Sequence, residues 1–172
     1  MPKPAPAPVS SAHVNEIARA LDRISYLTSR ARQHERLMAL AGVELDRAAS
    51  ALLQRIAESE PLRLGELAAR MSVEASHVTR QVQQMEKAGY VTRVPDPDDR
   101  RAQRIGLTAA GQRAVDRIRE ASRRGMEMAL ADWSPEELEQ LATLFHRMVD
   151  DFVARADVDV TLPPDRPASP GA

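Results

Sequence analysis

The chain of 172 residues lacks cysteine and lacks any long apolar run. Without a thiol, a redox switch on sulfur, a cysteine zinc site and a cysteine nucleophile are all excluded. No stretch approaches the roughly 20 apolar residues of a membrane-spanning helix, and the N-terminal residues do not form a basic-then-apolar export signal. We therefore expect a cytoplasmic protein without a membrane partner.

Aromatic residues and histidine are also scarce. The chain has two Phe, two Tyr and one Trp, so its core must consist of aliphatic side chains and methionine. No two of the four histidines stand at the i, i+4 spacing that places two imidazoles on one side of a helix, so a metal site would need acidic side chains to complete it, and we expect none. Because there is also no glycine-rich phosphate loop or nucleophile elbow, we expect neither an enzyme nor a bound cofactor.

The formal net charge is −1, which by itself argues against a nucleic-acid partner. The charges are unevenly distributed, however. Residues 63–113 contain nine Lys or Arg and six Asp or Glu, a balance of +3, so the rest of the chain carries −4. The positive field is therefore concentrated in one segment, as in proteins that bind nucleic acid through one lobe.

Proline marks the two ends of the chain. Eight of the twelve prolines lie in residues 1–11 and 157–172, where we expect polyproline-like, disordered tails. The chain as a whole is 43% hydrophobic and 28% charged, which suits a single compact domain over residues 12–156.

Residues 76–107 contain the most informative pattern. Val78, Val82 and Met85 recur at spacings of four and three, so they share a helix face that should point into a core. Gly89 then takes the position at which helices end with φ > 0, and the β-branched run after it begins a strand. At 100° per residue, the opposite face of this helix carries Ser76, Arg80, Gln83, Gln84 and Lys87, with His77 and Thr79 at its margins.

A charged turn follows this first strand. Residues 95–101 are too rich in Pro and Asp to continue it, and residues 105–107 supply a return strand. A helix followed by a two-stranded wing with a basic tip is typical of winged helix-turn-helix proteins. A helix of roughly 10–12 Å diameter fits the DNA major groove, where each base pair has a distinct donor and acceptor pattern, and an arginine at the wing tip can enter the minor groove. The alternative is that these arginines are ordinary solvated charges.

Residues 62–111 resemble the DNA-binding lobe of the MarR family of bacterial transcriptional regulators. The most specific part is DPDDRRAQRIGLTAAG, which matches the D-x-R wing of the family and the L-T-x-x-G start of its next helix. The resemblance implies a mainly α fold with a small β-wing. It places a winged helix-turn-helix DNA-binding lobe at residues 45–109 and dimerisation helices at residues 12–38 and 110–156.

Apolar residues at steps of three and four predict further helices on both sides of this segment. They cover residues 13–37, 45–58, 64–71 and about 109–131. Thr108 should cap the last of these, and a capping box of Ser134 and Glu137 begins a C-terminal helix. In the family that the chain resembles, the first helix pairs with the last two in a dimer.

The resemblance and the helix geometry together predict the DNA contacts. The match assigns Asp99 and Arg101 to the wing acid and the minor-groove arginine of the family, with Asp99 holding Arg101 in place and Arg100 binding phosphate. The complete predicted set is Ser76, His77, Thr79, Arg80, Gln83, Gln84, Asp99, Arg100 and Arg101. Because one lobe covers a half-site, we expect a homodimeric repressor on a pseudo-palindromic, double-stranded operator.

The resemblance also implies a small anionic or phenolic effector, bound between the dimer helices and the lobe. Arg23, Tyr26, Arg30 and His34 follow one another at helical spacings and could line such a crevice, with arginine binding a carboxylate. The alternative is a solvated helix face. A ligand that favours wrongly spaced DNA-reading helices would release the operator, while activation by a ligand, or no ligand at all, stays open.

A winged helix can also serve as a protein-interaction module, because fold does not dictate function. A protein-binding wing should expose apolar anchors, whereas this wing carries Arg100, Arg101 and Arg104. The sequence therefore favours a sequence-specific DNA-binding regulator over an interaction module.

Overall fold

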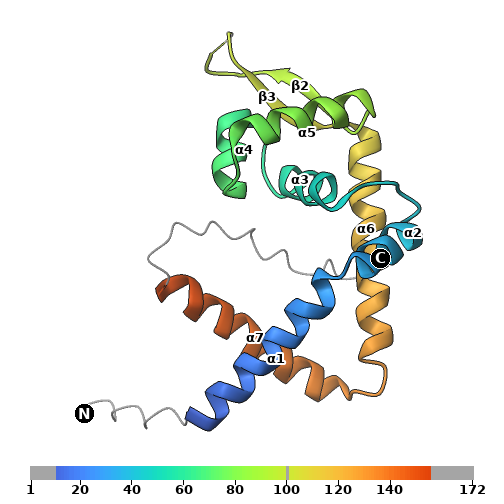
Figure 1. The fold of residues 1–172 in the computed structure, drawn as a ribbon, viewed down its shortest axis with the longest axis vertical. Coiled ribbons are helices and arrows are strands. Elements are labelled where there is room, and N and C mark those ends of the chain that lie inside the picture. The colour runs from blue at the N-terminus through green and yellow to red at the C-terminus, as the bar shows by residue number, and fades with distance from the viewer. Residues whose placement is uncertain (1–10, 100, 156–172) are drawn as a thin grey trace.

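The computed structural model describes residues 11–99 and 101–155. Its elements are α1 (Ser11–Ser29), α2 (Ala31–Ala41), α3 (Arg47–Ala57), β1 (Leu62–Arg63), α4 (Leu64–Met71), α5 (Ala75–Lys87), β2 (Val91–Pro95), β3 (Gln103–Leu107), α6 (Ala109–Ala129) and α7 (Pro135–Arg155). In Figure 1, α3, α4, α5 and the strands form one lobe, α1 and α7 extend away from it, and α6 connects the two parts. The predicted mainly α fold with a small β-wing is confirmed. The predicted tails lie outside the described residues, except for Ser11, which begins α1.

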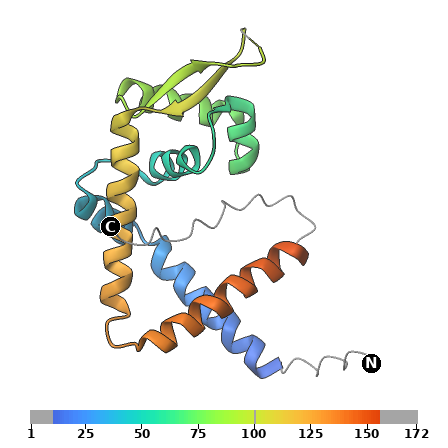
Figure 2. The same ribbon diagram turned by 180° about the vertical axis from the view of Figure 1, so that it is seen from behind.

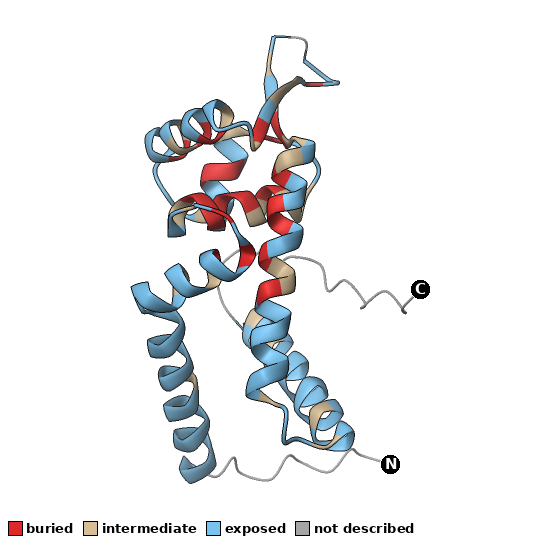
Figure 3. Ribbon diagram, turned by 90° about the vertical axis from the view of Figure 1, so that its right-hand side faces the viewer, coloured by how far each residue is buried: buried red, intermediate tan, exposed pale blue. Residues whose placement is uncertain are grey.

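The core lies inside the lobe and is aliphatic, as the scarcity of aromatic residues predicts. Leu53 of α3 and Ile105 of β3 are fully buried. On α5 the predicted inward face is confirmed, because Val78, Val82 and Met85 are all buried. Figure 3 shows the buried residues concentrated in the lobe and in the adjoining part of α6. α5 thus lies at the surface of a core to which α2 and α6 also contribute.

The wing belongs to a three-stranded antiparallel sheet with the order β1-β3-β2. Val91 of β2 pairs with Leu107 of β3, and Leu62 of β1 pairs with Ile105 on the other side of β3. The sequence prediction lacks β1, because two residues are too few to show the alternation that marks a strand. β3 is therefore central, and the hairpin is tied to the segment that leads into α4.

The start of α6 is fixed against the end of α5. Thr108 caps α6 as predicted: its Oγ1 accepts a hydrogen bond from the Gly111 amide (3.0 Å) and donates one to the Gly89 carbonyl oxygen (2.6 Å). Gly89 adopts φ +81°, as expected of a residue that ends a helix. Gly111 is needed for a different reason: a β-carbon there would overlap the Tyr90 carbonyl oxygen. The glycine of the L-T-x-x-G sequence is thus required because the start of α6 passes close to the backbone of Tyr90.

The predicted single helix over residues 13–37 is wrong. Arg30 has extended backbone angles (φ −69°, ψ 134°), which separate α1 from α2. Just before the break, the Thr28 hydroxyl donates to the Ile24 carbonyl oxygen (2.9 Å), and such back-bonding competes with the helical ladder and bends helices. The apolar period continues across the break, so periodicity could not reveal it.

α1 and α7 contain no buried residue. Figure 2 shows both extending away from the lobe, and Figure 3 shows α1 on one side of the molecule with the end of α6 and α7 on the other. Their exposed large apolar side chains are Val14, Ile17, Ile24, Tyr26 and Leu27 on α1, and Leu141, Leu144, Phe145 and Phe152 on α7. No helix among the described residues is long and apolar enough to cross a membrane.

The predicted capping box at the start of α7 is confirmed. The Ser134 amide donates to Glu137 Oε2 (2.8 Å), and the Glu137 amide donates to Ser134 Oγ (3.2 Å). Two otherwise unpaired amides of the first turn are thereby satisfied. α7 is consequently a well-started helix even though it buries nothing within the chain.

Candidate nucleic-acid interface

α5 presents a polar face to solvent, opposite the face that it buries. The exposed predicted residues on it are Ser76, His77, Arg80, Gln83 and Gln84. Thr79 is partly buried, and its hydroxyl donates to the Ala75 carbonyl oxygen (2.8 Å). The structure therefore gathers the six predicted residues of α5 on the solvent side of one helix, with donors and acceptors suited to base edges and phosphates.

The turn between α4 and α5 determines how α5 leaves the lobe. α4 ends at Ser72, which adopts φ +53°, and the Val73 amide donates to the Ala68 carbonyl oxygen (3.2 Å). This hydrogen bond closes α4 with a left-handed residue, a common helix ending. Residues 72–74 form the turn between the two helices, so α4 and α5 make a helix-turn-helix pair.

The charge on α5 is positive on its solvent side. Glu86 is the only acid of the helix, and its Oε2 pairs with Nε of Arg93 on β2 (3.1 Å). Arg80 and Lys87 form no ion pair with any residue that the structure describes. Both cations are therefore available to a polyanion, and the one carboxylate within α5 is ion-paired.

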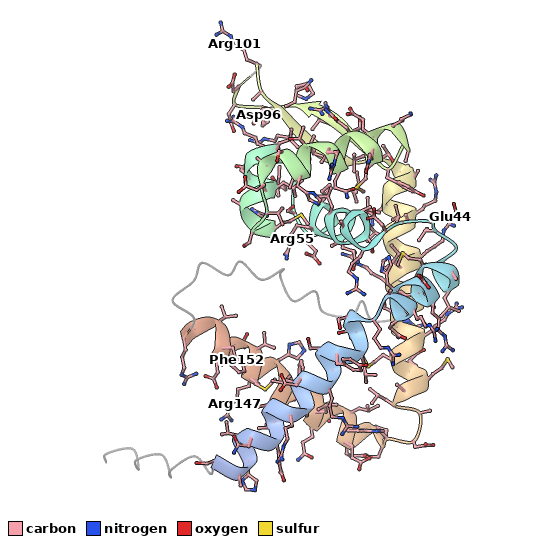
Figure 4. All side chains as sticks on the ribbon, viewed as in Figure 1. Glu44, Arg55, Asp96, Arg101, Arg147 and Phe152 are labelled. Carbon is pink, nitrogen blue, oxygen red and sulfur yellow. The ribbon has the colours of Figure 1, made fainter. Side chains whose placement is uncertain are left out.

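At the tip of the wing, the Arg101 guanidinium forms no hydrogen bond or ion pair with any residue that the structure describes. Asp99 Oδ1 accepts a hydrogen bond from the Arg101 backbone amide (3.0 Å), and the Ala102 amide donates to the Asp99 carbonyl oxygen (2.9 Å). Asp99 thus holds the backbone turn rather than the Arg101 side chain, which points away from the lobe in Figure 4. Arg100 lies outside the described residues.

The base of the wing contains a buried carboxylate that the sequence analysis missed. Asp96 has a fully buried side chain whose Oδ2 accepts from Nε of Arg63 (2.7 Å) and from Nε of Arg104 (2.8 Å). Its Oδ1 accepts from the backbone amides of Asp98 (2.9 Å) and Asp99 (3.2 Å). The hydrogen bond from Arg63, and then that from Arg104, hold the pKa of Asp96 well below its usual range.

This cluster corrects the expectation that Arg104 stands exposed on the wing beside Arg101. The Arg104 side chain is only 24% exposed and also binds Asp98 through Nη2 (3.1 Å). Arg63 lies 33 residues before Asp96, and the two come together because β1 pairs with β3 in the sheet. The run DPDD offers no pattern that distinguishes the buried aspartate from its exposed neighbours, so sequence reasoning had no means of finding it.

The lobe that carries this surface matches a known sequence family. Residues 45–102 match the model of the MarR family. The DNA-binding lobe is therefore of the MarR type. The chain is thus a MarR-type transcriptional regulator with a winged-helix fold, and the members of the MarR family are regulators rather than enzymes.

Relatives extend the match beyond the lobe. The HTH-type transcriptional regulator YybA of Bacillus subtilis is 25% identical over 135 residues, which span 78% of this chain and 83% of YybA. A MarR family protein from Bacillus stearothermophilus shares the fold, with a TM-score of 0.75 and 23% identity over 84% of this chain and 99% of that one. The transcriptional regulator Tm0710 from Thermotoga maritima gives a TM-score of 0.62 and 25% identity, again over 84% and 99% of the two chains.

A groove of about 1270 Å³ lies where α1, α2, α3 and α6 meet. Of the four residues predicted for an effector crevice, only His34 lines it, and His34 Nε2 is 2.8 Å from the Leu45 carbonyl oxygen. Arg23 and Tyr26 are exposed, and Arg30 stacks on the Tyr26 ring with its guanidinium carbon 5.7 Å from the ring centre. The break at Arg30 explains the difference, because residues that would share a face of one straight helix lie on two differently directed helices. No group of metal-ligating side chains occurs among the described residues.

Proposed function

We propose that this MarR-type regulator is a homodimeric repressor that binds a pseudo-palindromic, double-stranded DNA operator. Two features together support the proposal. The solvent face of α5 has no unpaired carboxylate, because Glu86 pairs with Arg93. The wing is held at its base by the ion pairs of Asp96 and has an arginine, Arg101, at its tip. α5 would enter the major groove, and Arg101 would enter the minor groove beside it. A protein that shares this fold, a mutant of S. aureus MepR, has been solved bound to an oligodeoxyribonucleotide, which supports the DNA partner.

Each residue of the surface takes a role that follows from its chemistry. Arg80, Gln83 and Gln84 are long enough to make paired hydrogen bonds to base edges. Ser76, His77 and Thr79 lie in the first part of α5, where hydroxyl, imidazole and backbone donors suit phosphates. Asp99 fixes the turn that presents Arg101, and we assign phosphate binding to Arg100.

The homodimer follows from the two helices that bury nothing. The exposed apolar side chains of α1 and α7 need a partner surface, and a second copy offers the same complementary helices. One lobe recognises one half-site, so a two-fold dimer places two α5 helices on an inverted repeat. Figure 4 shows Phe152 and Arg147 on α7, far from the wing, so dimerisation leaves the DNA face open.

The groove is the place that we assign to an effector. Its wall combines apolar residues such as Leu27, Leu40 and Met126 with the cationic Arg36 and Arg47. This lining suits a small anionic or phenolic molecule with an apolar body. A ligand held there acts on operator binding only if it prefers one spacing of the two lobes, and a coupling of roughly 1–3 kcal/mol is sufficient.

The proposal is tested by fluorescence anisotropy of the purified protein on the duplex upstream of its own gene, against a scrambled duplex, at two salt concentrations. We expect tight binding to the upstream duplex alone, weakened by salt. Arg101→Ala should weaken this binding by roughly tenfold, the value of one good base contact, without changing the melting temperature. Equal and weak binding of both duplexes would instead favour a protein-interaction module.

A second substitution tests how α5 recognises its bases. Arg80→Ala should remove roughly 1–3 kcal/mol of discrimination between the correct base pair and its alternatives, while binding to scrambled DNA changes little. The measurement is a competition between the operator and operators altered at one base pair at a time. Lys87→Ala is the matched control, since it also removes an exposed cation from α5. An Arg80→Ala protein that keeps the full preference at every position would exclude Arg80 from base recognition.

A further inference from the structure

Arg47 connects α1, the helix that extends away from the DNA-binding lobe and is called the arm below, to that lobe. It is the first residue of α3, and its Nη2 donates to the backbone carbonyl oxygens of Arg30 (3.2 Å) and Thr28 (3.4 Å). The two acceptors lie 17 and 19 residues earlier in the chain, at the break between α1 and α2. A single guanidinium therefore spans the joint at which the arm changes direction.

One of the two acceptors, Thr28, lies in the last turn of α1, whereas Arg30 precedes α2 and its carbonyl oxygen also accepts from the backbone amides of Gln33 (3.0 Å) and His34 (3.3 Å). The last carbonyl oxygens of a helix have no amide to accept from, and they carry the negative end of the helix dipole, which favours a cation. Arg47 supplies both a donor and a positive charge at that end. α1 has no buried residue, so its own packing contributes little to holding its direction.

The segment around Arg47 is itself held in place. His34 of α2 contacts the Leu45 carbonyl oxygen (2.8 Å), and Arg117 Nη1 of α6 donates to the Gly42 carbonyl oxygen (3.4 Å). Asp46 Oδ1 accepts from the Ala49 amide (2.7 Å) and caps α3. The loop between α2 and α3 is thus hydrogen-bonded to both α2 and α6. The chain changes direction at the extended residue Arg30, between α1 and α2.

We infer that Arg47 is a positioning residue that sets the direction of α1 and, through the dimer, the spacing of the two α5 helices. This inference rests on the homodimer proposed above, in which α1 pairs with a second copy. A change in the angle of α1 at Arg30 moves one lobe relative to the other, because the lobe and the arm meet at that joint. Arg47 also lines the groove, so a groove occupant that accepts its hydrogen bonds would compete with the Thr28 and Arg30 carbonyl oxygens.

The absence of cysteine makes a direct test simple. An Ala69→Cys substitution places one spin label on the exposed side of α4 in each protomer, and pulsed electron paramagnetic resonance then measures the distance between the two lobes. In the otherwise unaltered full chain we expect one narrow distance distribution. Adding Arg47→Ala should broaden or shift that distribution and weaken binding to the operator, while sedimentation still gives a dimer and the melting temperature changes little.

Two further variants distinguish positioning from a general loss of charge. Arg36→Ala also removes an arginine from the groove wall, but Arg36 donates no hydrogen bond to the Thr28 or Arg30 carbonyl oxygen, so the distance distribution should stay narrow. Arg47→Lys keeps the charge with a shorter reach and should restore the distribution only in part. If the Arg47→Ala protein is a dimer with the same distance between its lobes as the parent, the role of Arg47 is overturned but the homodimer is not. A monomeric parent would overturn the homodimer, and the role of Arg47 with it.

Discussion

Gly111→Ala should destabilise the DNA-binding lobe by at least about 3 kcal/mol, the upper part of the range for overpacked sites. The added β-carbon would overlap the Tyr90 carbonyl oxygen and stand 3.0 Å from the Tyr90 carbonyl carbon. Both are backbone atoms, so no side chain can rotate to make room. The start of α6 would have to move away from β2, breaking the hydrogen bond between Thr108 and Gly89.

Urea unfolding of the parent and the variant measures this loss. Gly65→Ala is the matched control, because a β-carbon at Gly65 in α4 would meet no atom within 4 Å. In a helix, exchanging glycine for alanine with free space should be neutral or stabilise by up to about 1 kcal/mol. Equal unfolding midpoints for the Gly111→Ala protein and its parent would show that the backbone approach does not constrain this position.

Asp96→Asn should free the wing from the lobe and weaken specific DNA binding by roughly tenfold or more, as expected for a lost minor-groove contact. The substitution removes the charge that two arginines share and leaves Arg63 and Arg104 without their buried partner. The core of the lobe does not include Asp96, so helix content should be retained. Anisotropy on the operator measures the loss of affinity. Asp98→Asn is the matched control, because the Asp98 side chain is 81% exposed and pairs with one arginine, Arg104, rather than with two.

The stabilisation that Asp96 provides should also depend on pH in a defined direction. Its pKa is lowered in the folded state, whereas an aspartate in the unfolded chain has a pKa of about 4. Its contribution is therefore complete above about pH 4 and is lost as the pH falls toward the lowered value. The difference in melting temperature between the parent and Asp96→Asn should stay constant from about pH 7 to pH 5 and shrink below about pH 4. A difference that grows on acidification would contradict this assignment of the buried charge.

Local patterns were sufficient to predict the lobe. The spacing of Val78, Val82 and Met85 identified the buried face of α5, and Gly89 and Thr108 identified the junction between α5, the wing and α6. Each of these signals depends on neighbours within a few residues, as helix faces and caps do. The polar face of α5 follows from the same spacing, because it lies opposite the buried face.

Contacts between distant residues could not be predicted in this way. Asp96 reads like Asp98 and Asp99 in the sequence, and only the pairing of β1 with β3 brings Arg63 close enough to bury it. The break at Arg30 is bridged by Arg47, which stands on a different helix. The four residues predicted to bind an effector were assumed to lie on one straight helix. The break at Arg30 separates His34 on α2 from Arg23 and Tyr26 on α1.

Two copies of this chain should read an inverted DNA repeat with α5 and the wing. Repeated selection of bound duplexes from a random pool by the purified full chain tests this directly, because the operator sequence need not be chosen in advance. We predict an enriched sequence with two inverted half-sites whose centres lie about 10 base pairs, or one helical turn, apart, and no enrichment by the Arg80→Ala, Arg101→Ala double variant. If the parent enriches no sequence, or enriches a single half-site without symmetry, the proposal that two copies recognise an inverted repeat is contradicted.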